Sequence, residues 1–313
     1  MATPELTAGA EPRLRPGSLS GRRRIGEDVV KGVLALCALL SVATTVGIVF
    51  ALFVPAAEFF REVSSVDFFT GTTWAPLFEP ASFGVLPLIS GTLLVTAIAS
   101  LVAMPLGLGA AIYLSEYASP RTRGILKPAL EILAGIPTIV FGYFALTYVT
   151  PLLRDVGIQV DIFNTLSAGL VMGVMLMPTV ASLSEDAMGA VPRDLRDGAY
   201  ALGSTKVQVA TRIVVPAAVS GIVASFVLAI SRAVGETMIV LVAMGQQPNL
   251  TFDPREAAET MTAFIAATGA GDVPTGSLEY KTIFAVGATL FVLTFAMNVF
   301  AIRLVRRYRE VYE

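Results

Sequence analysis

Residues Glu185 to Pro216, EDAMGAVPRDLRDGAYALGSTKVQVATRIVVP, form a long polar interruption between two apolar runs. The charges of this stretch follow helical turns instead of being scattered as in a slack loop. Pro192 suits the first position of a helix, and Asp194 suits its first turn, where negative charge meets the positive end of the helix dipole. Three apolar residues recur at i, i+4 and i+7 and predict one apolar stripe on this helix: Leu195, Ala199 and Leu202.

A second short helix is predicted after the first. Gly203 is expected to end the first helix, and Ser204 can cap the next. That second helix carries three spaced apolar residues toward Pro216: Val207, Ala210 and Ile213. The stretch therefore predicts a helix, a glycine elbow and a second helix, joined at both ends to apolar segments.

The elbow resembles the "EAA" signature of ABC-importer permeases. The signature falls on residues 197–216, and its matching residues are Asp197, Ala199, Gly203, Ile213 and Pro216. Gly198 departs from the usual Ala, which keeps the side chain small but weakens the helix by up to about 1 kcal/mol. The resemblance implies a coupling helix that docks on a separate ATP-hydrolysing subunit. The alternative is an interfacial amphipathic helix without a partner.

Composition indicates a membrane protein. Hydrophobic residues make up 55% of the 313 residues and charged residues 15%, and the mean hydropathy is +0.73. The chain has no histidine, and its only cysteine, Cys37, lies in an apolar run. This inventory excludes histidine-dependent catalytic triads, His or Cys zinc sites and a disulfide framework. We expect no catalytic residue, no metal site and no cofactor bound by this chain.

The apolar runs predict an all-α polytopic protein with six transmembrane helices. Residues 1–28 are expected to be a disordered basic cytoplasmic tail, followed by a transmembrane permease domain at 29–313. Each run has at least the ~20 residues that cross a bilayer core. The expected spans are Gly32–Ala57, Phe83–Leu114, Ile125–Leu153, Ile162–Ala181, Pro216–Met244 and Thr282–Ile302.

Lys and Arg residues set the expected orientation. Their number alternates between high and low along the successive segments that connect the spans. The N-terminal tail has five and the C-terminal tail has four. The five loops between the spans have, in order, one (Arg61), three (Arg121, Arg123, Lys127), one (Arg154), four (Arg193, Arg196, Lys206, Arg212) and two (Arg255, Lys281). Both termini and residues 185–216 are therefore predicted to be cytoplasmic, and the resemblance to ABC-importer permeases implies a bacterial inner membrane.

Several local features carry structural predictions. Gly135-Ile136-Pro137 predicts a kink in the third span, and Gly169 with Gly173 predicts close helix packing. Residues 255–268 are expected to form a helical piece in the last outer loop. In the first outer loop, aromatic residues are expected to be interface anchors and to pack under a partner domain, with a ligand cage as the less favoured alternative: Phe68, Phe69, Trp74 and Phe78.

Arg232 and Glu236 are charged residues inside the fifth apolar run. Their spacing of four predicts one helix face, and each charge at that depth costs on the order of 2.5 to 3.5 kcal/mol. They are candidates for an anion path, in which Arg232 offers a two-pronged cation, Glu236 weakens its hold, and Ser231 and Thr237 add neutral donors. The alternative is an ion pair within the helix that has only a structural role. Glu131 is instead expected to pair with Lys127.

The segment Arg232 to Thr237, RAVGET, resembles phosphate-importer permeases, as does GIPTIVFG from Gly135 to Gly142. The likeness favours the PstC type over its PstA-type partner. It implies transmembrane import of inorganic phosphate, with lipid around the chain and three kinds of partner: a PstA-type permease, two PstB-type ATPases that use ATP and Mg, and a PstS-type extracytoplasmic binding protein. No nucleic acid is expected.

The chain is not expected to be an enzyme. Gly198 to Thr205 superficially matches a phosphate-binding loop but lacks its Lys and a preceding strand, so ATP hydrolysis is assigned to another subunit. Molybdate or sulfate import is the alternative cargo. A secondary anion transporter is the alternative class, although RAVGET has no second copy. A membrane scaffold for phosphate sensing is another alternative, but it would not need a charged residue lining a pore.

Overall fold

The computed structural model describes residues 25–307, with side chains over residues 27–303. The chain divides into two compact units, Met1–Ala51 and Leu52–Glu313. Within the first unit the described part is helical, because helix α1 runs from Ile25 to Glu62. Residues 1–24 of the predicted tail lie outside the described residues, whereas residues 25–28 belong to α1.

In the described part of the second unit, helices are joined by loops and by one short strand pair, β1 (Trp74–Ala75) with β2 (Ser82–Phe83), which is antiparallel with Trp74 opposite Phe83. In chain order the first helices are α2 (Ser65–Thr70), α3 (Leu86–Ile112), the π-helical turn η1 (Tyr113–Tyr117), α4 (Pro120–Ala134), α5 (Thr138–Phe144), η2 (Ala145–Val149), α6 (Thr150–Asp155) and α7 (Thr165–Gly189). They are followed by α8 (Arg193–Ala201), α9 (Lys206–Val209), η3 (Ala210–Val214), α10 (Val215–Ala217), α11 (Val219–Val234), α12 (Met238–Ala243), α13 (Met261–Ala270) and α14 (Leu278–Arg307).

Four helices in the described part are long and apolar enough to cross a membrane: 27–62, 86–117, 165–189 and 278–303. Two bent pairs raise the number of possible spans to six. One pair is Pro120–Ala134 with Thr138–Asp155, bent by 87°, and the other is Lys206–Ala217 with Val219–Val234, bent by 72°. The polytopic all-helical class is confirmed, and the kink at Gly135-Ile136-Pro137 appears as a complete break.

The prediction of a continuous fifth span over 216–244 is wrong. Helix α11 ends at Val234, Gly235 caps it, and α12 begins only at Met238. The break leaves the backbone of Gly235 and Glu236 outside both helices, so the two charged residues of this segment do not share one helix.

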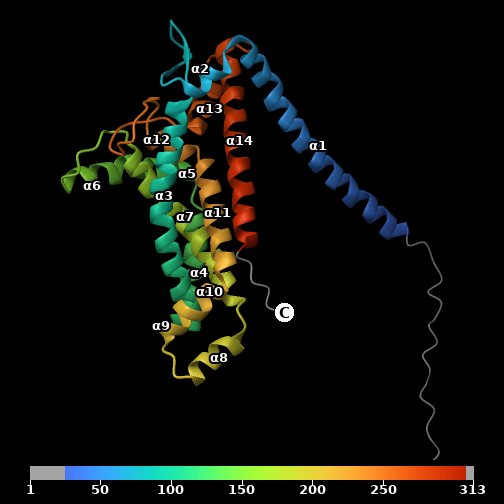
Figure 1. The fold of residues 1–313 in the computed structure, drawn as a ribbon, viewed down its shortest axis with the longest axis vertical. Coiled ribbons are helices and arrows are strands. Elements are labelled where there is room, and N and C mark those ends of the chain that lie inside the picture. Colours follow the sequence, from blue (N-terminus) through green and yellow to red (C-terminus); the bar gives the residue numbers. More distant parts are fainter. Residues whose placement is uncertain (1–24, 308–313) are drawn as a thin grey trace, which may run out of the picture. The chain divides into compact units, whose positions relative to one another are not determined.

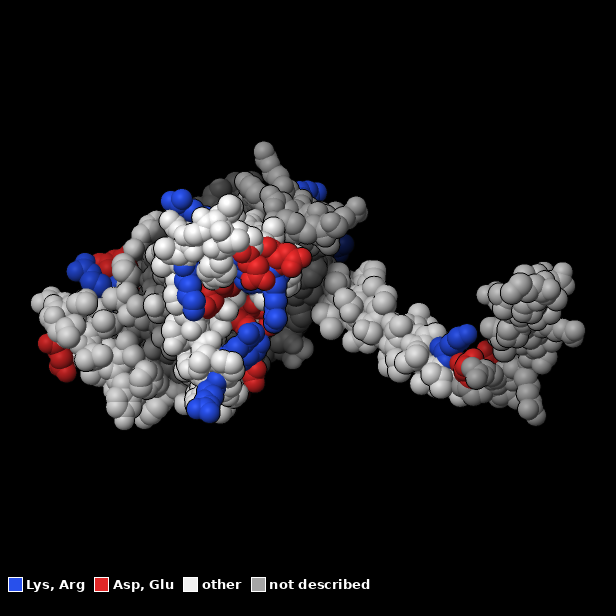
Figure 2. Space-filling view, turned by 90° about the horizontal axis from the view of Figure 1, so that it is seen from below, with Lys and Arg blue, Asp and Glu red and all other residues white. Residues whose placement is uncertain are grey.

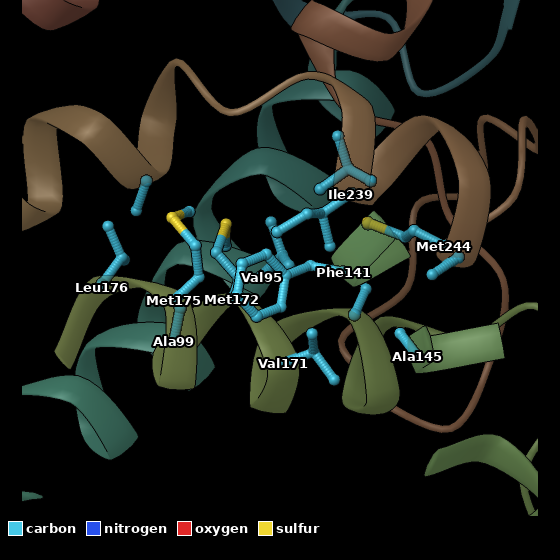
Figure 3. Close-up of a cluster of buried hydrophobic side chains, with 14 of the residues drawn as sticks. Val95, Ala99, Phe141, Ala145, Val171, Met172, Met175, Leu176, Ile239 and Met244 are labelled. Carbon is cyan, nitrogen blue, oxygen red and sulfur yellow. The ribbon is translucent and has the colours of Figure 1, made fainter. Parts of the chain in front are cut away.

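The main core lies between α3, α5, α7 and α12, where side chains from these helices meet (Figure 3). Phe141 and Ile239 are labelled there beside Met172 and Met175. Helices α3 and α7 lie close together because Gly169 and Gly173 have no side chain: a Cβ at Gly173 would lie 2.6 Å from Val102 Cβ. Close packing at this GxxxG is confirmed.

A second core lies at one end of this unit. Phe68 and Trp74 are buried there with Phe59, Phe264 and Val286. These two aromatic residues therefore pack inside the chain and not under a partner, whereas Phe69 and Phe78 are exposed. The predicted helical piece at 255–268 is shifted: α13 begins at Met261, after the N-cap Thr260, and it is largely buried.

Within residues 52–313, α8 and α9 lie at one end and α2 and α13 at the opposite end (Figure 1). Helices α3, α7 and α14 run along the length between these ends (Figure 1). The elbow and the second aromatic core are therefore separated by the helical bundle.

Candidate functional site

The elbow forms as predicted around Gly203. The N–H of Gly203 donates to the Tyr200 carbonyl at 2.9 Å, and the N–H of Ser204 donates to the Ala199 carbonyl at 3.1 Å. This pair of bonds closes the C-terminus of α8 in the motif that requires a left-handed residue, and Gly203 has φ +81°. Glycine is therefore favoured at position 203 by its backbone conformation. Space does not require it, because no atom lies within 4 Å of a Cβ built there.

Two capping assignments in the elbow are wrong by one residue. Pro192 is the N-cap of α8 and not its first helical residue. Thr205, not Ser204, caps α9: its hydroxyl accepts from the N–H of Gln208, whose side chain accepts from the N–H of Thr205 in return. The N–H of Ser204 closes α8, and Thr205 is the next residue and starts α9.

The predicted apolar stripe of α8 is only partly buried. Ala199 is buried, but Leu195 is 40% exposed and Leu202 is 89% exposed. Val207 on α9 is also exposed, and Asp197 and Gly198 lie on the surface beside it. In the second half of the elbow Ile213 is half-buried and Pro216 is exposed. The tip of the elbow therefore presents apolar side chains outward.

An ion pair ties α8 to the helix bundle. Arg196 Nη2 lies 3.2 Å from Glu116 Oε1, and both side chains are largely buried. The same guanidinium donates to the carbonyls of Val191 and Met188 at 2.7 Å. Because Glu116 belongs to η1, which continues α3, and Met188 belongs to α7, Arg196 joins α8 to two long helices.

Lys127 does not pair with Glu131, so that prediction is wrong. Lys127 Nζ lies 2.8 Å from Glu185 Oε2 and 3.0 Å from Asp186 Oδ1, and Arg123 also pairs with Glu185. The contacts join α4 to the end of α7, whereas Glu131 is exposed. Figure 2 shows the resulting mixture of basic and acidic side chains on this end of the molecule.

Arg232 lies in the last turn of α11 with its side chain exposed. Its Nη1 lies 3.4 Å from Thr179 Oγ1 on α7, which is a weak contact at the limit of hydrogen bonding. Arg232 makes no ion pair with any residue that the structure describes. Its charge is therefore available to a ligand or to another subunit.

Glu236 has a role that the sequence reasoning missed. Its Oε1 accepts from the backbone N–H groups of Met238 at 3.1 Å and Ile239 at 3.3 Å, so the carboxyl group caps α12. Its own carbonyl accepts from Thr262 Oγ1 at 2.7 Å. The ion pair between Arg232 and Glu236 within one helix is excluded, because Glu236 is buried in the break. Its hydrogen bonds contact α12 through the carboxyl group and α13 through the carbonyl.

The two neutral candidates also have partners. Ser231 Oγ donates to Asn298 Oδ1 of α14 at 2.9 Å, and Thr237 Oγ1 donates to the carbonyl of Gly235 at 3.2 Å. Ser231 is thus adjacent to Arg232 but is directed to another helix. Thr179 and Asn298 are additional polar residues here, and only the rarity of polar side chains in apolar runs signals them in the sequence.

The comparisons with known proteins agree with this architecture. Residues 103–310 match the family model described as "Binding-protein-dependent transport system inner membrane component". This chain belongs to that family. It is an ABC-importer permease, a multi-pass protein of the bacterial plasma membrane, and the matched region includes both the elbow and the Arg232 segment.

Among curated relatives, the permease is 34% identical over 260 residues to the "Phosphate transport system permease protein PstC" of Xylella fastidiosa, which covers 77% of this chain and 78% of the relative. It is 34% identical over 281 residues to the "Probable ABC transporter permease protein YqgH" of Bacillus subtilis, with 88% and 91% coverage. The resemblance to PstC-type permeases is therefore confirmed.

Solved structures share the fold. A bacterial ABC transporter "involved in the import of the acidic polysaccharide alginate" aligns with a TM-score of 0.63 at 17% identity, covering 92% of the permease and 100% of that chain. The MetNI methionine ABC transporter in an inward-facing conformation aligns with a TM-score of 0.55 at 18% identity, with 72% and 95% coverage. At these identities the likeness concerns the fold alone.

Proposed function

We propose that this permease forms half of the translocation path of an ATP-driven importer of inorganic phosphate. The observation that carries the proposal is the guanidinium of Arg232, exposed in an apolar helix without a carboxylate partner among the described residues. A cation at that depth costs on the order of 2.5 to 3.5 kcal/mol against lipid, so it requires an aqueous path or a second subunit. The relatives named as phosphate permeases make phosphate the favoured anion.

Arg232 would meet two oxygens of the passing anion with its two-pronged donor group. Thr179, 3.4 Å from the guanidinium, would add a neutral donor. Glu236 would act differently from the sequence-based hypothesis. Because its carboxyl group is engaged with two backbone N–H groups, it would fix the break after Arg232 instead of contacting the anion directly.

Energy would come from other subunits. The exposed apolar tip of the elbow, with Leu202 and Val207, would dock on a separate ATPase that binds ATP and Mg. The chain itself would have no ATPase site. A second, PstA-type permease would complete the path, two PstB-type ATPases would drive it, and a PstS-type binding protein would deliver phosphate at the end opposite the elbow.

Molybdate or sulfate import is the second candidate, because an arginine recognises any of these oxyanions. Phosphate is favoured by the RAVGET sequence and by the relatives' names. A secondary transporter is disfavoured by the elbow, whose exposed apolar tip serves no purpose without a docking partner. A scaffold for phosphate sensing would share the elbow but would not need Arg232.

The test is oxyanion-stimulated ATP hydrolysis. The permease would be purified with its second permease and ATPase, reconstituted in lipid vesicles and supplied with its binding protein. We expect phosphate, and not sulfate or molybdate, to stimulate hydrolysis and to accumulate inside the vesicles. Stimulation by sulfate or molybdate at equal concentration, without stimulation by phosphate, would overturn the assignment.

A further inference from the structure

A cavity lies at the end of the permease opposite the elbow. It has a volume of about 430 Å³ and lies between α13 and the segment that begins with β1. Its apolar wall includes Trp74, Leu77, Phe78 and Phe264, and the rings of Trp74 and Phe264 are 4.9 Å apart in an edge-to-face arrangement. Neither Lys nor Arg lines this cavity.

Two polar groups at this cavity lack partners. Glu259 lines it and is only 5% exposed, and its carboxyl group has no hydrogen bond or ion pair with the described residues. Trp74 also lines it, and its indole Nε1 is buried without a hydrogen-bond partner in the described part of the chain. The Nε1 atom of Trp74 is sealed from the cavity, so the buried carboxyl group of Glu259 is the polar group that a ligand in this cavity can reach.

The cavity lining has acidic and no basic side chains, which favours a cationic ligand. Glu259 is the one buried acid in the lining, and Asp272, the other acid there, is exposed. Burial raises the pKa of Glu259 to about 7, because the loop before α13 is packed against α3 and shields the carboxyl group from water. A cation beside this carboxylate would reverse that effect, whereas an anion would be repelled. The cavity is therefore unsuited to phosphate.

We infer that this cavity binds an organic cation, an ammonium or guanidinium group on an apolar stem, with Glu259 as its counterion. The stem contacts Leu77 and the aromatic wall, and the cation contacts the carboxylate of Glu259 and the faces of aromatic rings. Such a group belongs either to a free alkylamine or to a Lys or Arg side chain of a protein docked at this end. The inference does not depend on which anion the permease transports.

Trp74 is the only tryptophan of the chain, so its fluorescence reports this cavity directly. The purified full chain would be titrated at pH 8 with n-butylammonium, and with n-butanol as an uncharged probe with the same stem. We expect a saturable change of Trp74 emission with n-butylammonium only. Glu259→Gln should weaken binding at least tenfold, while Glu256→Gln, an exposed acid in the same loop, should leave it unchanged.

A second measurement avoids any variant. Lowering the pH from 8 to 6 protonates Glu259 and should weaken n-butylammonium binding to the unmodified protein severalfold or more. The absence of a saturable response, an equal response to n-butanol, or binding that is insensitive to both pH and Glu259→Gln would overturn the inference.

The source of the cation is distinguished by a third probe, acetyl-Gly-Lys-Gly-amide. Competition between this peptide and n-butylammonium would show that the cavity admits a Lys side chain carried on a peptide backbone, as a docked protein requires. Binding of n-butylammonium without competition would assign it to a free amine. Either result supports a cation site, and only the identity of its carrier differs.

Discussion

Arg232 combines exposure, a full positive charge and a position within an apolar helix. Replacement by Gln removes the charge but keeps a polar side chain of similar length. We expect Arg232→Gln to reduce phosphate uptake at least tenfold, because the loss of a charge-assisted contact costs about 1.5 to 3 kcal/mol. Uptake in vesicles measures this.

Assembly must be checked in the same experiment, because a misassembled complex also fails to transport. Arg232→Gln should co-purify with its partner subunits in normal amount. Arg61→Gln, which removes an exposed charge in the last turn of α1, should transport normally. If Arg232→Gln transports at the normal rate, the guanidinium has only a structural role.

Glu259 should make the folded protein less stable as the pH rises from 4.5 to 7. Its pKa is about 7 in the folded protein and 4.5 ordinarily, so between these values the unfolded chain loses a proton that the folded chain retains. The free energy of unfolding should therefore fall by about 3 kcal/mol between pH 4.5 and pH 7, and this loss should be complete above pH 7.

The test compares thermal unfolding midpoints at pH 5 and pH 7.5. Wild-type protein should lose more stability over this interval than Glu259→Gln, because the amide does not titrate. Glu256→Gln should behave as wild type. Identical pH profiles for the wild type and Glu259→Gln would show that the carboxyl group is not shielded from water.

Among the helices, the breaks show what the sequence predicts and what it does not. The first break was predictable because Gly135 and Pro137 both disfavour a continuous helix. The second was missed because Gly235 alone is tolerated in a helix, and the capping role of Glu236 depends on its carboxyl group turning back to Met238 and Ile239. A Gly followed by Glu-Thr before an apolar run is the local signal that would have indicated a new helix start.

Long-range partners explain the remaining errors. Lys127 is close in sequence to Glu131, but tertiary packing brings Glu185 and Asp186 nearer. Similarly, the spacing on α8 predicted a buried stripe, whereas a short helix at the tip of the molecule can bury only the side chains that face the bundle. The elbow itself was predictable, because Gly203 and its spacing act locally.

Gly203 should be essential to the elbow. A β-branched residue at φ +81° costs on the order of 1 to 3 kcal/mol, so Gly203→Val should distort the join between α8 and α9. We expect phosphate uptake per ATP hydrolysed to fall severalfold or more, or assembly to fail. The measurement is uptake and ATP hydrolysis on the same vesicles.

Gly198 supplies a matched control within the same helix. No atom lies within 4 Å of a Cβ built there, and Gly198→Ala should stabilise α8 by up to about 1 kcal/mol. Transport should remain coupled in this variant. Normal coupling in Gly203→Val would contradict the role assigned to the elbow.

The ion pair of Arg196 with Glu116 should transmit movement of α8 to α3. Glu116→Gln leaves the bonds from Arg196 to the Val191 and Met188 carbonyls but removes the carboxylate at 3.2 Å. We expect a loss of about 1 to 3 kcal/mol in stability and a severalfold lower uptake per ATP hydrolysed. Glu131→Gln, an exposed acid on α4, should change neither. Unaltered coupling in Glu116→Gln would mean that another contact transmits the movement.

One helix connects the two candidate sites across the molecule. The end of α7 holds Arg196 through the carbonyl of Met188, and its middle places Thr179 beside Arg232. Because α7 is a single helix packed closely on α3, displacement of the elbow by an ATPase would be carried to the Arg232 region as a rigid-body movement. This is the physical basis of the proposed coupling.

The central claim is that Arg232 lines an aqueous path in the assembled transporter. The chain has one cysteine, so a Cys37→Ser background allows single cysteines to be tested with a charged, membrane-impermeant thiol reagent. Asp197→Cys, on the exposed elbow, serves as the reactive control in inside-out vesicles, and Val292→Cys, exposed on apolar α14, serves as the lipid-facing control. The account predicts that Arg232→Cys reacts in the assembled complex when the path is open, while Val292→Cys does not. If Arg232→Cys stays unreactive from both sides of the membrane, with and without ATP, the guanidinium does not face the anion's route and the account is wrong.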